Sequence, residues 1–152
     1  APISSLEEET IDIEDDEAVI RLLRSGIEHQ TGGHRQAALA CYEAAAGYDP
    51  FVPDTYALLG IALEASGAHA KAAESFQKAL FIHPYNWFAA FKLAQTQEAL
   101  GDKARALQAY RQALEGMQSD QAIFDARLEF EEFDRIEKHR NEVAEVCRGK
   151  IA

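Results

Sequence analysis

A spacing of 34 residues recurs along this chain, and several kinds of residue keep it at once. The residues that keep it are the alanines Ala38, Ala72 and Ala106, the glycines Gly33, Gly67 and Gly101, and the aromatic residues Tyr42, Phe76 and Tyr110. A period of this length is typical of one supersecondary unit that repeats along the chain. Such units stack on one another to bury their apolar faces, so the spacing predicts a repeat architecture.

Residues 53–84 show what one unit must look like. Apolar residues recur there every three to four positions in two separate runs, which predicts two amphipathic helices. Gly67 lies between the runs, where a helix end favours a residue without a β-carbon. Pro53 suits a helix start and Pro84 a helix end. The unit is therefore a helical hairpin, and the 28 alanines of the chain keep the paired helices close together.

These residues resemble the tetratricopeptide repeat (TPR) family. The second unit matches its pattern at Tyr56, Gly60, Leu63, Gly67, Ala72, Phe76, Ala79 and Pro84. The first unit departs at His29, and the third departs at Ala90, Gln97 and Gln118. The resemblance implies an all-α fold, a TPR α-solenoid in which antiparallel helix pairs form a right-handed superhelix. We place three units within 17–118, at about 19–50, 53–84 and 87–118.

The two ends of the chain differ from the repeats. Residues 1–16 form an acidic leader or linker that we expect to be flexible, although its alternating Ile and acidic residues also suit a docking segment. Residues 1–18 carry eight of the acids behind the net charge of −11, and no base. Residues 119–152 have an apolar stripe and predict one or two capping helices, beginning near Ser119 or Asp120.

Catalytic and cofactor motifs are missing from the sequence. The five histidines have no metal-ligand spacing, and Cys41 and Cys147 are 106 positions apart. We therefore expect no enzyme, no metal and no cofactor. The body offers no basic face for nucleic acid, and no stretch is long and apolar enough for membrane insertion. Two unpaired cysteines and no visible secretory signal suggest a cytoplasmic protein.

The family resemblance places certain positions of each unit's first helix on the concave side of the superhelix. Most of those positions are apolar here, which indicates a groove for a peptide. The residues predicted to form this groove are Ile20, Leu23, Ile27, Asp54, Ala57, Ile61, Glu64, Phe88, Phe91, Gln95 and Glu98. The alternative is that the C-terminal helix or the leader packs into the same strip and closes it.

The groove residues also indicate what kind of partner to expect. TPR domains that grip acidic chaperone tails use basic residues, whereas this chain has Leu23, Ile27, Leu58 and Phe88 there, and only Lys92 would serve. We expect a protein partner with an apolar segment and a Lys or Arg near Glu64 and Glu98.

Four roles suit such a module. We favour an adaptor or a cargo chaperone that binds a partner segment without catalysis. The chain also resembles the bacterial class II chaperones of type III secretion. The regular repeats and the leader also suit a regulatory TPR domain excised from a larger bacterial signalling protein, such as a chemoreceptor methyltransferase. A self-assembling scaffold, and hence a homo-oligomer, stays open.

Overall fold

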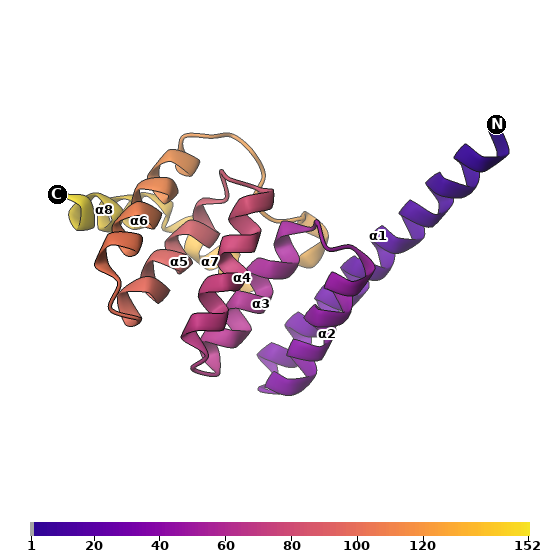
Figure 1. Cartoon of the computed structure of the whole chain (residues 1–152), viewed down its shortest axis with the longest axis horizontal. Helices are drawn as coiled ribbons and strands as arrows, with labels where there is room; N and C mark the ends of the chain where they lie inside the picture. The colour runs from indigo at the N-terminus through magenta and orange to yellow at the C-terminus, as the bar shows by residue number, and fades with distance from the viewer. Residues whose placement is uncertain (1) are drawn as a thin grey trace.

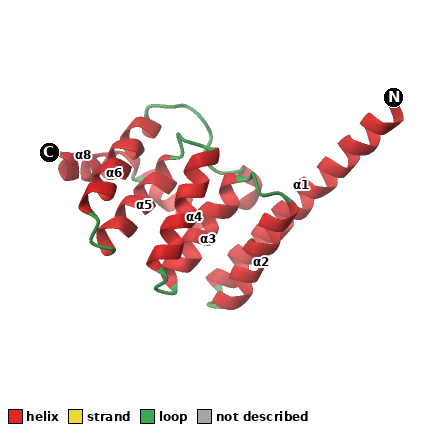
Figure 2. Cartoon of the chain, viewed as in Figure 1, coloured by secondary structure: helices red, strands yellow, loops and turns green. Residues whose placement is uncertain are grey.

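Helices follow one another along the computed structural model, which describes the backbone of residues 2–152 and the side chains from Asp15 onward. Figure 2 shows helices joined by short turns and a single longer loop. Their bounds are α1 Pro2–Thr31, α2 Arg35–Tyr48, α3 Pro53–Ala65, α4 His69–Ile82, α5 Trp87–Ala99, α6 Lys103–Met117, the short 3₁₀ helix η1 Ala126–Leu128, α7 Glu131–Lys138 and α8 Arg140–Ile151. The all-α fold class is confirmed.

The first six helices form three antiparallel pairs, α1–α2, α3–α4 and α5–α6, which stack side by side (Figure 1). These pairs are the three repeats that the 34-residue spacing predicts. The aromatic residue of each second helix lies at the centre of its pair, and Tyr42 and Phe76 are fully buried. The core therefore runs as one continuous cluster through the stack.

Two glycine positions explain why each repeat folds as a tight pair. Gly67 ends α3 with a φ of +80°, a left-handed conformation that costs glycine little. Inside the same pair, Gly60 lies against the ring of Phe76, and a β-carbon built on Gly60 would come within 2.6 Å of Phe76 Cε1. The helices can approach this closely only because the side chain is missing.

Helix α1 is longer than the first helix of the other repeats. It begins at Pro2 and so includes the backbone of the acidic leader, and its first half projects away from the stack (Figure 1). The side chains of residues 1–14 lie outside the described part of the chain. The flexibility that we expect for the leader stays a prediction.

The C-terminal part is divided differently from our expectation of a helix beginning near Ser119. Ser119 does accept a hydrogen bond, but in a turn, from the backbone N–H of Gln121 to its Oγ (3.2 Å). After a loop and η1, helix α7 begins only at Glu131, and α8 follows at Arg140. This break separates α7 from α8, and the two helices pack against different parts of the stack.

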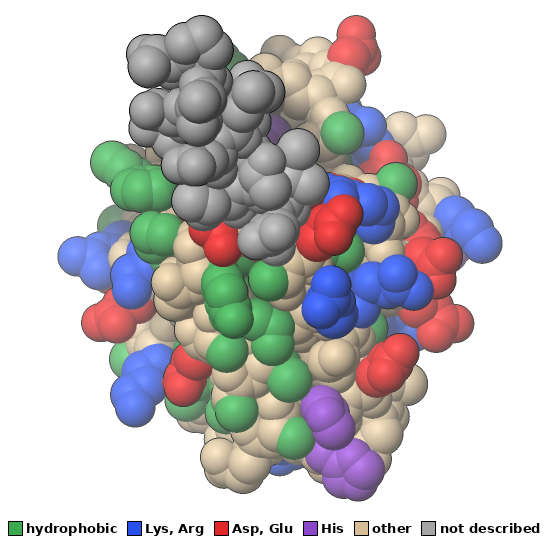
Figure 3. Space-filling model, turned by 90° about the vertical axis from the view of Figure 1, so that its right-hand side faces the viewer, with side chains coloured by type: hydrophobic (Ala, Val, Ile, Leu, Met, Phe, Trp, Pro, Cys, Tyr) green, Lys and Arg blue, Asp and Glu red, His purple; other side chains and the backbone are tan. Residues whose placement is uncertain are grey.

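The two ends of the stack of repeats differ in what covers them. At the C-terminal end α8 packs against α6 and buries Cys147 completely, which covers the last repeat as a capping helix does. At the other end, Figure 3 looks onto the α1–α2 pair, where hydrophobic side chains lie in a strip beside charged ones. Within the described residues, no helix is long and apolar enough to cross a membrane.

Candidate functional site

The structure brings the predicted groove residues together on one face, formed by the first helix of each repeat. Most of them are buried, namely Ile20, Leu23, Asp54, Ala57, Ile61, Phe88 and Phe91. Ile27 and Glu64 are half-buried, whereas Gln95 and Glu98 are exposed. Phe91 also contacts α6, because its ring lies 6.3 Å from that of Tyr110. The apolar part of the groove is therefore covered.

Part of this cover comes from the chain itself, between Gln121 and Lys138. We call residues 121–138 the return segment, because the loop after α6 leads them back across the stack, where α7 lies behind α5 in Figure 1. Three phenylalanines of this segment surround Phe88 of α5. Their ring centroids lie 5.4 Å (Phe124), 6.4 Å (Phe130) and 5.4 Å (Phe133) from the Phe88 centroid. All three pairs meet edge to face, an arrangement that aromatic quadrupoles favour.

Polar contacts tie the return segment to the first helix of every repeat. Arg127 Nη1 lies 3.0 Å from Asp16 Oδ2 of α1, and Lys92 Nζ of α5 donates to Glu132 Oε1 at 3.0 Å. On α3, Asp54 Oδ2 accepts the backbone N–H of Asp125 at 2.8 Å. The segment thus spans all three repeats.

Asp54 is the titratable group that this arrangement perturbs most clearly within the groove. Burial raises its pKa to about 6, because the carboxylate loses its hydration. The backbone N–H of Asp125 acts in the opposite direction, and the charge of His83 adds to that lowering, whereas the Asp125 carboxylate raises the pKa further. The groove therefore holds a carboxyl group that titrates within the mildly acidic range.

The two acids at the predicted edge already have partners. Glu64 Oε2 accepts from Thr96 Oγ1 at 2.9 Å, and Glu64 Oε1 lies 2.6 Å from His69 Nδ1. Glu98 accepts from the Tyr110 hydroxyl and from Lys150 Nζ of α8, the latter at 3.1 Å. The Tyr110 hydrogen bond lowers the pKa of Glu98. Glu98 at this edge therefore already pairs with a cation of the chain itself, Lys150.

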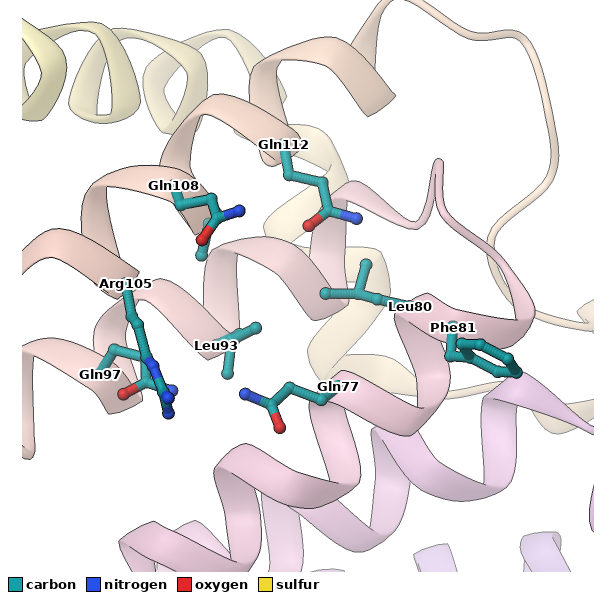
Figure 4. A pocket seen from close by; sticks show the side chains of 9 residues that line it. Gln77, Leu80, Phe81, Leu93, Gln97, Arg105, Gln108 and Gln112 are labelled. Carbon is teal, nitrogen blue, oxygen red and sulfur yellow. The ribbon is translucent and has the colours of Figure 1, made fainter. Parts of the chain in front are cut away.

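A second hollow lies between α4, α5 and α6, away from the groove (Figure 4). Its volume is about 360 Å³, and its lining is rich in amides, from Gln77, Gln97, Gln108 and Gln112, beside Arg105 and Leu93. This lining can donate and accept neutral hydrogen bonds. Among the described residues, no group of three or more His, Cys, Asp or Glu side chains is placed to hold a metal ion.

A third surface escaped the sequence analysis. Phe51, in the α2–α3 loop, and Phe81, near the end of α4, are 73% and 88% exposed. They line a hollow of about 440 Å³ with Pro50, Tyr56, Lys78 and Ile82. Neither phenylalanine occupies a position that the repeat pattern places in the core, and this departure from the pattern could have marked both as surface residues.

The return segment is the other feature that sequence reasoning placed only as an alternative. Phe124, Phe130 and Phe133 belong to the apolar stripe of 119–152, which we expected to cover the last repeat. That covering is done by α8, while the stripe lies in the groove. Three phenylalanines within ten residues were the sequence feature that could have indicated a segment lying in the groove.

Known proteins share both the repeat and its arrangement. Superkiller complex protein 3 of Mus musculus is 33% identical over 89 residues, which are 59% of this chain and 6% of the mouse protein. The chain thus spans only a small part of that relative. The TPR domain of Sgt2 from Aspergillus fumigatus is similar in structure, with a TM-score of 0.63 and 23% identity over 85% of this chain and 82% of that one.

A Yersinia enterocolitica protein is similar over nearly its whole length. This is the type III secretion chaperone SycD, solved in complex with a peptide of the translocator YopD. Its TM-score is 0.66 at 17% identity, over 87% of this chain and 93% of that one. At such identities the similarity shows the fold. Tetratricopeptide repeat patterns match residues 23–86 and 89–115, so the chain belongs to the tetratricopeptide repeat family.

Proposed function

We propose that this chain is a non-catalytic protein-interaction module, an adaptor or cargo chaperone, which binds an apolar segment of a partner protein in the groove. The observation that carries the proposal is the position of the return segment. A stretch of chain with three phenylalanines already lies across α1, α3 and α5 and is held by polar contacts to each. This position of an apolar stretch supports the binding of an apolar partner segment in the same place.

The acidic edge supports a partner that also carries a basic side chain. Lys150 pairs with Glu98 at 3.1 Å, so that a partner lysine or arginine would compete for the same carboxylate. Exposed pairs of this kind contribute at most about 1 kcal/mol. The aromatic contacts therefore supply the affinity, and the edge acts on the orientation of the bound segment.

Selection of displayed peptides on the full chain tests this proposal. We expect the selected peptides to be apolar and to protect amides of α1, α3 and α5 from hydrogen exchange. Ile27→Glu, at a half-buried position facing the return segment, should weaken their binding at least tenfold. Phe81→Ser, on the exposed α4 surface, is the matched control and should leave binding unchanged.

The opposite footprint would contradict the proposal. Protection confined to α4 and the α2–α3 loop, or binding that Ile27→Glu does not affect, would place recognition outside the groove. Failure to select any peptide would contradict it as well.

A cargo-chaperone role of the secretion type is the more specific form of this proposal. Its support is that the similarity to SycD extends beyond the repeats over nearly the whole of both chains. The YopD peptide seen with SycD is therefore a ready probe for the full chain. Binding that Ile27→Glu weakens would support this form, and no binding would leave the general adaptor role alone.

A further inference from the structure

The return segment is held by three buried side chains, Ile123, Leu128 and Phe130, and by a helix that is only partly buried. Its helix α7 has eight residues and buries none of them fully. Phe133 and Ile136 pack against the core but keep part of their surface exposed. In contrast, the neighbouring α8 buries Ala144 and Cys147 against the last repeat. The cap and the groove filler are therefore separate elements.

The connections on both sides would allow the segment to leave while the cap stays. Residues 118–120 before it are exposed or half-buried and lie outside any helix. After it, the chain breaks between α7 and α8 at His139, which is itself exposed. A helix as short as α7 is marginal in water on its own, so that it depends on the groove for its order.

The groups that the return segment would leave without a partner show which side chains a segment replacing it must supply. When Glu132 leaves, Lys92 of α5 loses its carboxylate partner, which now lies 3.0 Å away. Phe88 and Trp87 lose the ring of Phe133, whose centroid lies 6.1 Å from that of Trp87. An occupant that satisfies these groups needs aromatic side chains and a carboxylate close to one another.

We propose that residues 121–138 are an intramolecular ligand of the groove, and that the partner segment which displaces them has the same chemistry, aromatic side chains with an adjacent carboxylate. This inference rests on the proposed function, because it names the ligand class of the same groove. The partner then competes with the return segment, and its apparent affinity falls by the fraction of chains whose groove is open.

A labelled synthetic peptide with the sequence of residues 121–138 is the probe, and the full chain is its receptor. Phe124→Ser, Phe130→Ser and Phe133→Ser together should release the internal segment and leave the groove walls intact. We expect the peptide to bind this triple variant at least tenfold more tightly than the wild type, as measured by fluorescence anisotropy. Phe81→Ser, a phenylalanine outside the groove, should bind the peptide as the wild type does.

Lys92 provides a second, milder test, and its fluorescence readout does not depend on the triple variant remaining folded. Lys92→Glu should weaken binding of the wild-type peptide at least fivefold in an opened chain, and a peptide carrying Glu132→Lys should restore it. Within the unlabelled full chain, Lys92→Glu should alter the fluorescence of Trp87, which is the only tryptophan and contacts Phe133. The double variant with Glu132→Lys should return it to the wild-type value.

Two results of the peptide and Trp87 experiments would overturn the inference. One is a folded triple variant that binds the peptide no better than the wild type, and the other is a Trp87 signal that neither Lys92→Glu nor the double variant changes. The peptide experiment needs no external partner, so its result is independent of the peptide selection described above. If selected partner peptides bind wild type and opened chain equally, the proposed function stands and the inference fails.

Discussion

At Gly60 the first helix of the second repeat touches the ring of Phe76 on the second helix, and a β-carbon there would lie only 2.6 Å from that ring. Phe76 is fully buried and cannot move aside freely. Gly60→Ala should therefore destabilise the fold by about 1–3 kcal/mol, the usual cost of overpacking a core. Urea unfolding measures the change.

Gly47 is the matched control for that substitution. It lies within α2, and a β-carbon there would meet no atom within 4 Å. Gly47→Ala should change stability in the opposite direction, by up to about 1 kcal/mol, because alanine favours helix. Equal effects at the two positions would show that helix preference, and not contact with Phe76, governs Gly60.

Asp54 gives a pH-dependent prediction at the same scale. Its folded pKa of about 6 lies above the ordinary value of 3.8, so the folded state holds its proton more tightly than the unfolded state does. This contribution to stability is present at low pH and is lost as the pH rises from about 4 to above 6. Asp54→Asn removes it, so the stability of the variant relative to wild type should rise by about 2 kcal/mol between pH 4 and pH 7.

Thermal or urea unfolding across that pH range measures the difference. Glu43→Gln, at an exposed position of α2, controls for the loss of an acid from a helix. A difference between Asp54→Asn and wild type that stays constant with pH would mean that the Asp54 carboxyl is not buried in the folded chain.

At the scale of elements, α8 should act as the cap of the third repeat. Cys147, on the face of α8 that packs against the repeat, is fully buried, whereas Val146, the residue before, is 47% exposed. Cys147→Glu should destabilise the chain by about 3 kcal/mol or more, because a carboxylate would lose its water without gaining a partner. Val146→Glu, on the same helix, should have little effect, and equal losses in urea unfolding would contradict the capping role.

The elements differ in how well the sequence predicts them. The hairpins were predictable because their causes are local: Gly67 turns the chain, and Gly60 and Phe76 meet within one repeat. The C-terminal helices were predictable in kind but not in extent. No residue near Ser119 explains why helix α7 begins only at Glu131. Its start depends on the long-range contact between Phe130 and Phe88.

At the scale of the whole molecule, stability should be unevenly distributed. Helix α5 lies in the middle of the fold and buries nine of its residues, whereas α7 buries none fully. Amides of α7 should therefore exchange with solvent faster than those of α5, by roughly two orders of magnitude, through local opening that leaves the repeats folded. Native-state hydrogen exchange measures this, and equal protection would mean that the two unfold as one unit.

The groove stays a prediction, and the segment that covers its residues could not be predicted from the sequence. The periodic positions place Ile20, Ile61 and Phe88 on one face, because every repeat presents its first helix in the same way. The occupant depends instead on pairs far apart in the chain. Asp125 meets Asp54 across 71 positions and Arg127 meets Asp16 across 111, and no local pattern encodes such pairs.

The repeat, its helical hairpins and the apolar face that they share can be read from the amino-acid sequence, because they follow from contacts within 34 residues that recur three times. The path of residues 119–152 emerges only when the whole chain is folded. The stripe from Ile123 to Ile136 could cover any apolar surface, and the path of the loop after α6 leads it into the groove while α8 caps α6. The physical reason is that hydrophobic burial is non-directional, so the geometry of the whole chain chooses which surface is buried.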